Sequence, residues 1–297
     1  MRSRLAPIFV MISLAGCGAL PFSHSDGGAA DARQFDGGES VALTLDTFSV
    51  PAGGEVYKCQ DFANPFGGAE VSVSGFESHM TPGSHHLLMF FKDGASNGAL
   101  SDCSGFEFGA GPYGSQRPDD QISYPPGIGV TIAPSRGFRV QVHYLNSSPN
   151  PIEPQAQVLF HVAQPGSITN RAAVLFFNNT SIVVPPGATP TTISKTCTIP
   201  YDINLLQSTG HMHLAGTDFL ATAGATRLFE SSTWENVAPA MYDPPLALKA
   251  GSTVTFACTY LNTTGVALTF GESARTNEMC IFTGQFYPAI GDGLGCQ

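Results

Sequence analysis

The chain has 297 residues, which is long enough for two ordinary domains. Hydrophobic residues make up 42% of it and charged residues only 12%, so a sizeable core can form with few ion pairs. The formal net charge of -10 and the lack of any basic cluster in the sequence argue against nucleic acid or an anionic lipid surface as a partner.

Residues 1–17 have the pattern of a secretory signal. Two early arginines precede an apolar run from Leu5 to Leu14, and small residues follow it. The segment ends in Leu-Ala-Gly-Cys, which resembles the lipobox of bacterial lipoproteins. We therefore expect Cys17 to carry lipid and to become the mature N-terminus. The alternative is a plain signal peptide with a chance cysteine.

Residues 18–40 are rich in Gly, Ala, Ser and Asp and predict a flexible tether. No later run in the sequence is apolar over the ~20 residues that a membrane-spanning helix needs. The protein is therefore expected to be exported and held at a bacterial membrane, on the periplasmic side or at the cell surface, through its lipid anchor alone.

The rest of the sequence is dominated by strand patterns separated by turn patterns. Alternating or continuously apolar segments predict strands at 40–50, 70–76, 85–91, 137–146, 155–163, 172–179 and 252–262. Pro- and Gly-rich segments predict turns at 64–68, 125–129, 147–154, 184–190 and 242–246. No apolar period of 3.6 residues reaches helical length, so we predict an all-β protein built of antiparallel sandwiches.

The clearest break between strand patterns lies around residues 163–170. It predicts two β domains, at 41–165 and 166–297. Six cysteines remain once Cys17 is set aside, and an exported chain can oxidise them to three disulfides, although six cysteines allow 15 pairings. The sequence has no Cys-x-x-Cys motif, which disfavours a zinc site made of thiolates.

Four short motifs could carry metal chemistry. His85 and His86 are adjacent, so both can face one ion only if their strand bulges or begins there. His143 projects from the polar face of its strand, beside Gln141. His211 and His213 are two residues apart and share a face, which turns Met212 toward the core.

The fourth motif places Met279 directly before Cys280. Each motif also has an ordinary structural explanation, such as a buried core methionine or an inert surface histidine. Imidazole combined with thioether is a ligand set that suits copper, especially Cu(I), better than zinc, magnesium or calcium.

In their order, "HH", "VHY", "HMH" and "EMC" resemble the copper type II, ascorbate-dependent monooxygenases, which include the peptidylglycine α-hydroxylating and dopamine β-hydroxylating enzymes. The resemblance covers nearly all of residues 45–297. It implies two jelly-roll-like β-sandwich domains that face each other across an open, solvent-filled cleft. It also implies three disulfides, Cys59–Cys103, Cys197–Cys296 and Cys258–Cys280.

The resemblance further implies two mononuclear copper sites. One would be held by His85, His86 and His143 and would pass an electron. The other, which would bind O2 and substrate, would be held by the three catalytic residues His211, His213 and Met279.

This sequence departs from the peptide-amidating members at two positions. Thr209 stands where those members have an arginine that anchors the substrate carboxylate, and Thr283 stands where they have a tyrosine. Tyr57 and Gln141 do match positions near the family's sites. These four residues are weak candidates for substrate binding, and a peptide with a C-terminal glycine is not the expected substrate.

The expected function is that of an exported, monomeric monooxygenase with two copper ions per chain. It would hydroxylate a C–H bond of a small organic molecule with O2 and a one-electron donor such as ascorbate. The alternative is a lipoprotein that binds or carries copper without catalysis, since the missing arginine and tyrosine could reflect a lost substrate site. A third alternative is a structural surface lipoprotein with inert histidines.

Overall fold

A computed structural model of the chain describes residues 38–103 and 109–297. The predicted signal peptide, Cys17 and most of the predicted tether lie outside the described residues. The described residues form strands and no α-helix, which confirms the all-β prediction. Accordingly, they include no helix that is long and apolar enough to cross a membrane.

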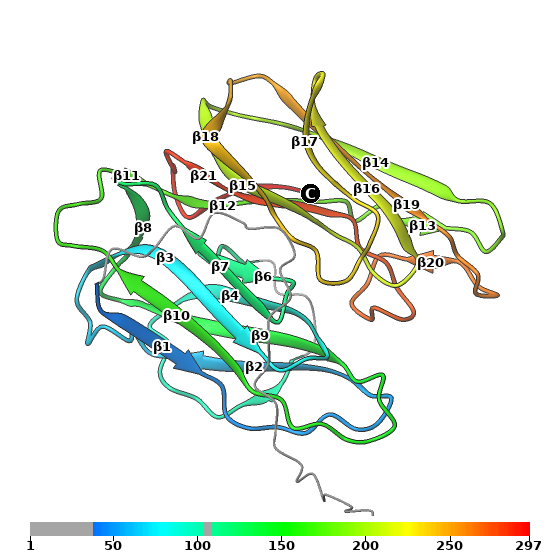
Figure 1. Ribbon diagram of the computed structural model, residues 1–297, viewed down its shortest axis with the longest axis horizontal. Helices are drawn as coiled ribbons and strands as arrows, with labels where there is room; N and C mark the ends of the chain where they lie inside the picture. Colours follow the sequence, from blue (N-terminus) through cyan, green and yellow to red (C-terminus); the bar gives the residue numbers. More distant parts are fainter. Residues whose placement is uncertain (1–37, 104–108) are drawn as a thin grey trace, which may run out of the picture. The chain divides into compact units, whose positions relative to one another are not determined.

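The first half of the chain forms two sheets (Figure 1). One has the order β1 (Ser40–Thr44), β10 (Ala156–Val162), β3 (Val71–Met80), β8 (Ile128–Ile132) and β11 (Asn170–Arg171), and β7 (Asp119–Ser123) also pairs with β3. The other has the order β5 (Ser101–Asp102), β2 (Glu55–Phe62), β9 (Arg136–Leu145), β4 (Ser84–Asp93) and β6 (Tyr113–Ser115). Neighbouring strands are antiparallel, except that β11 runs parallel to β8.

The second half forms a five-stranded, a four-stranded and a two-stranded sheet. The five-stranded sheet has the order β18 (Ala240–Leu248), β15 (Ile203–His211), β21 (Ile281–Tyr287), β12 (Ala173–Asn178) and β22 (Gly293–Cys296). The four-stranded sheet has the order β14 (Thr191–Thr198), β19 (Thr253–Tyr260), β16 (Gly216–Ala223) and β17 (Thr226–Ser231). Strands β13 (Val183–Val184) and β20 (Leu268–Thr269) make the small one.

Each half has its own hydrophobic core between its sheets. In β9, the alternate residues Phe138, Val140, Val142 and Tyr144 are completely buried in the first core, as their alternation predicts. The second core contains Phe219, Phe256 and Phe282 among other buried side chains. All the described residues nevertheless belong to one compact unit.

One predicted turn is wrong. Residues 242–246, with their two consecutive prolines, lie inside β18. This strand is at the edge of its sheet and pairs only with β15, and the register of that pairing shifts between Leu205 and Gln207. In this register Leu205 pairs with Leu246 and Gln207 with Met241, so residues 242–245 have no paired residue in β15, and an edge strand tolerates proline at such an irregularity.

Three disulfides join Cys59 to Cys103, Cys197 to Cys296 and Cys258 to Cys280. These are the pairs that the family resemblance implies. Three disulfides suggest an extracellular or otherwise oxidising compartment.

Candidate metal centre

Five histidines from three separate parts of the sequence gather in one buried cluster. The His85 ring centroid lies 5.2 Å from that of His86, 5.0 Å from His143, 4.8 Å from His211 and 5.4 Å from His213. All five side chains are buried, and His143 and His213 are completely so. The five histidines that were predicted as metal ligands are therefore neighbours in space.

The two adjacent histidines reach the cluster because β4 is irregular where it begins. The pairing of β4 with β9 shifts register between Ser84 and His86, which is the bulge that their shared role requires. Gly83, directly before the strand, has φ +100°, a backbone conformation that residues other than glycine rarely adopt. The predicted irregular entry into this strand is confirmed.

The HMH motif spans the end of a strand. β15 ends at His211, and His213 lies two residues further on, with ring centroids 5.2 Å apart. Met212 between them is 1% exposed and belongs to the second core. The prediction that Met212 faces the core is confirmed.

Six imidazole nitrogens in this cluster have no hydrogen-bond partner among the described residues. They are Nε2 of His85, both ring nitrogens of His86, Nδ1 of His143, and Nε2 of His211 and of His213. A buried nitrogen without a partner costs on the order of 1–3 kcal/mol. Each ring thus has a nitrogen available to a metal ion, and the ligand atoms of His85, His86 and His211 lie within 4.8 Å of one another.

Three of the rings have their proton position set by a neighbour. Nε2–H of His143 donates to Glu55 Oε1 at 2.8 Å. Nδ1–H of His211 donates to Gln116 Oε1 at 2.7 Å, and Nδ1–H of His213 donates to the Asn277 carbonyl at 3.3 Å. The opposite nitrogen of each ring then has the free lone pair. Hydrogen-bond acceptors fix the rings of metal-binding histidines in the same way.

Electrostatics keep these rings in the neutral form that binds metals. Burial, together with the neighbouring imidazoles, holds the pKa values of His85, His86 and His211 well below 6.5. Burial also lowers the pKa of His143, and it lowers the pKa of His213 to about 3. The cluster is therefore uncharged at neutral pH and available to a cation.

Histidines from the two predicted ligand sets lie close to one another. The ligand atoms of His85, His86 and His211 all lie within 4.8 Å of one another, although His211 belongs to the second predicted set.

Met279 is fully buried and is held close to the HMH segment by its neighbours. The carboxylate of Glu278 accepts hydrogen bonds from the backbone N–H of His213 at 3.0 Å and of Ala215 at 2.7 Å. On the other side, Cys280 is tied to Cys258. Burial raises the pKa of Glu278 to about 7.

Glu55 makes three hydrogen bonds beside the cluster. Besides His143, its carboxylate accepts hydrogen bonds from the Ser273 hydroxyl at 2.8 Å and the Ala274 N–H at 2.7 Å. Burial opposes its charge, but these donors outweigh it and lower its pKa from 4.5 to about 2. Glu55 thus joins a strand of the first half to a loop of the second.

Glu55, Gln116 and Glu278 were not predicted as site residues from the sequence. Glu55 and Gln116 lie outside every motif, and each reaches its partner across more than 85 residues of sequence. Glu278 lies within the EMC motif, but nothing local indicated that its side chain would hold the backbone of His213.

The four weak candidates for substrate binding, Tyr57, Gln141, Thr209 and Thr283, have different surroundings. The Tyr57 ring stacks on His143 with centroids 3.8 Å apart, and its hydroxyl donates to the Glu272 carbonyl. Gln141 is completely buried, with its amide nitrogen 3.8 Å from Cys59 Sγ. Of the four, only Thr209 and Thr283 line the cavity beside the histidine cluster.

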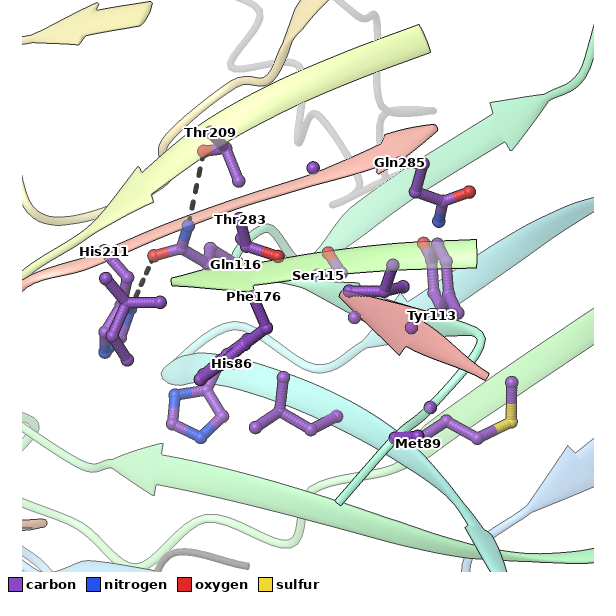
Figure 2. A pocket seen from close by; sticks show the side chains of 18 of the residues that line it. His86, Met89, Tyr113, Ser115, Gln116, Phe176, Thr209, His211, Thr283 and Gln285 are labelled. Carbon is purple, nitrogen blue, oxygen red and sulfur yellow. Dashed lines mark hydrogen bonds between the residues drawn. The ribbon is translucent and has the colours of Figure 1, made fainter. Parts of the chain in front are cut away.

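A cavity of about 420 Å³ opens beside the histidine cluster. His86 and His211 lie toward one end of it, and Tyr113 and Gln285 lie away from them (Figure 2). Its walls come from β4 and β6 in the first half and from β12, β15, β21 and β22 in the second. The volume is that of a pocket for a small organic molecule.

No protein-family model and no curated protein matches the sequence. Among solved structures, the major capsid protein P2 from bacteriophage PM2 is similar at 7% identity and a TM-score of 0.35, covering 86% of this chain and 100% of that one. A likeness this low carries no argument about function.

Proposed function

We propose that this protein is an exported, copper-dependent monooxygenase that hydroxylates a C–H bond of a small organic molecule. The observation that carries the proposal is the cluster of five buried, neutral histidines with free ring nitrogens at one end of a cavity of ligand size. Buried polar groups without partners are rare in native proteins, and free imidazoles are ligands for copper and similar metals.

Two copper ions per chain are proposed, with His85, His86 and His143 as one ligand set and His211, His213 and Met279 as the other. The thioether of Met279 favours copper over harder ions. When bound, copper would supply one-electron chemistry with O2. The overall reaction is R–H + O2 + 2 e⁻ + 2 H⁺ → R–OH + H2O, and ascorbate or another one-electron donor would provide the electrons.

The protein's own groups would orient the ligands and exclude water. Glu55, Gln116 and the Asn277 carbonyl hold three imidazoles with their free nitrogens turned to the cluster. Burial of all five rings keeps bulk water from competing for the metals and from quenching reactive species. The cavity brings a substrate next to His86 and His211.

The finer architecture is part of this proposal. We propose two jelly-roll-like domains that face each other across a cleft, and a monomer that is attached to a bacterial membrane only through lipid on Cys17. The two separate cores support the division into two domains. The three disulfides support export to an oxidising compartment.

The test begins with metal binding. Trp234 is the only tryptophan, and its ring centroid lies 5.3 Å from that of His85, so bound Cu(II) should quench its fluorescence. Anaerobic titration with Cu(I) should saturate at two ions per chain. Saturation below two ions would contradict the proposal.

Catalysis is tested separately by O2 uptake with ascorbate across a panel of small organic molecules. Uptake by the wild type should exceed that of Met279→Ala with at least one of them, and a hydroxylated product should form. Tight copper binding with rapid transfer to another protein, but no oxygen chemistry, would instead identify a copper carrier.

A further inference from the structure

We propose that the cavity beside the histidine cluster binds an uncharged, largely apolar molecule, with the bond to be oxidised directed toward His86 and His211. This inference rests on the proposed function for the fate of that bond. The ligand class itself follows from the walls of the cavity, as Figure 2 shows in part.

Apolar side chains from both halves form much of the wall. Leu88, Met89 and Phe90 come from β4, and Val174 and Phe176 come from β12. Glycines of β21 and β22 leave further room between them. Apolar walls favour an apolar ligand because both surfaces leave water on binding.

Apart from His86 and His211, whose free nitrogens belong to the metal cluster, several polar side chains in the wall are satisfied by the protein. Gln116 bonds to His211 and to the Gly210 carbonyl, and Gln285 accepts from the Tyr124 hydroxyl and donates to the Pro112 carbonyl. The Thr283 hydroxyl donates to the Leu175 carbonyl at 2.8 Å. These groups offer little to a ligand that would need strong hydrogen bonds.

The charges in the wall also disfavour an ionic ligand. Among the described residues, the wall contains two carboxylates, Asp120 and Asp292, and no lysine or arginine. An anion would face these carboxylates and lose its hydration without a cationic partner.

Neither carboxylate calls for a cationic ligand. Asp120 accepts from the Ser115 hydroxyl at 3.1 Å and the Gln121 N–H at 3.0 Å, and it lies 3.7 Å from Arg117. Asp292 is paired with Arg136 at 3.1 Å and Arg171 at 3.8 Å. Their negative charges already have partners within the protein.

The test is calorimetric titration of the full chain, purified without metal, with three probes of nearly equal size: methyl naphthylacetate, naphthylacetate and naphthylethylamine. We expect the uncharged ester to bind at least about tenfold more tightly than either the anion or the cation. Equal or tighter binding of a charged probe overturns the proposal, and so does a lack of binding by the ester at millimolar concentration.

A charge placed in the wall gives an independent check. Thr209→Arg should tighten binding of naphthylacetate by at least about tenfold, whereas the uncharged control Thr209→Met should not, provided that both variants unfold at the same temperature as the wild type. A gain of equal size in Thr209→Met would contradict the charge argument. Because no step requires copper or O2, these results stand or fall separately from the monooxygenase proposal.

Discussion

Removal of the Glu55 carboxylate should destabilise the protein and weaken metal binding together. In Glu55→Ala, the Nε2–H of His143 and the N–H of Ala274 lose their acceptor, and the hydroxyl of Ser273 must turn elsewhere. The side chain of Glu55 is only 17% exposed, so water replaces the carboxylate poorly. The effect therefore combines lost hydrogen bonds with donors that remain buried.

Two estimates of the loss in the free energy of unfolding of Glu55→Ala are similar. Hydrogen bonds to a charged group contribute about 1.5–3 kcal/mol each, and two buried donors lose one each, so about 3 kcal/mol is the low end of the loss. The lowering of the Glu55 pKa from 4.5 to about 2 corresponds to roughly 3 kcal/mol at about 1.36 kcal/mol per pH unit, before a reduction for partial solvent contact.

The assay is thermal unfolding of the metal-free protein at pH 7, followed by copper titration. At about 2–4 °C per kcal/mol for a chain of this size, Glu55→Ala should lower the midpoint by roughly 6–12 °C. Copper affinity should fall about 10–100-fold, because the His143 ring loses the partner that fixes its proton. Glu55→Gln keeps one acceptor oxygen and should lose only about 1 kcal/mol.

Glu153→Ala is the matched control, since Glu153 is exposed and should change neither quantity. If Glu55→Ala unfolds and binds copper like this control, the hydrogen bonds of Glu55 neither stabilise the fold nor fix the His143 ring for metal binding.

Three further outcomes are expected. Met212→Leu should keep copper binding because Met212 packs in the second core, whereas Met279→Leu should lose Cu(I) affinity or activity; equal affinities in a Cu(I) competition titration would contradict the assignment. Replacement of Cys258 and Cys280 by alanine should lower the free energy of unfolding by about 3 kcal/mol, because the disulfide closes a loop that spans 22 residues. An unchanged midpoint in reversible denaturant unfolding would argue against the disulfide. The Arg139 guanidinium, with Lys92, holds the pKa of Asp61 below its ordinary value although burial opposes this shift. The ionised Asp61 therefore stabilises the fold at pH values above its ordinary pKa. This stabilisation is lost as the pH falls through the lower pKa of the folded state. Asp61→Asn should therefore flatten the acid side of a stability–pH profile, and an unchanged acid slope would count against the pairing.

The sequence by itself determined the local features of this protein. Alternation in β9 predicted which residues would enter the core, since successive strand residues point to opposite faces. The same geometry assigned Met212 to the core, and the adjacent histidines required the bulge that is found between Ser84 and His86. These predictions succeeded because each depends on a few neighbouring residues.

Only the tertiary structure decided how distant groups meet. It brought the ring centroids of His85 and His211 to 4.8 Å from each other. It also let Glu55 and Gln116 accept hydrogen bonds from His143 and His211, which are far away in sequence. It also made β18 out of a segment with a turn-like sequence, because an edge position tolerates proline. Local periodicity carries no information on such contacts, since they depend on how whole sheets pack and on which side chains burial then forces together.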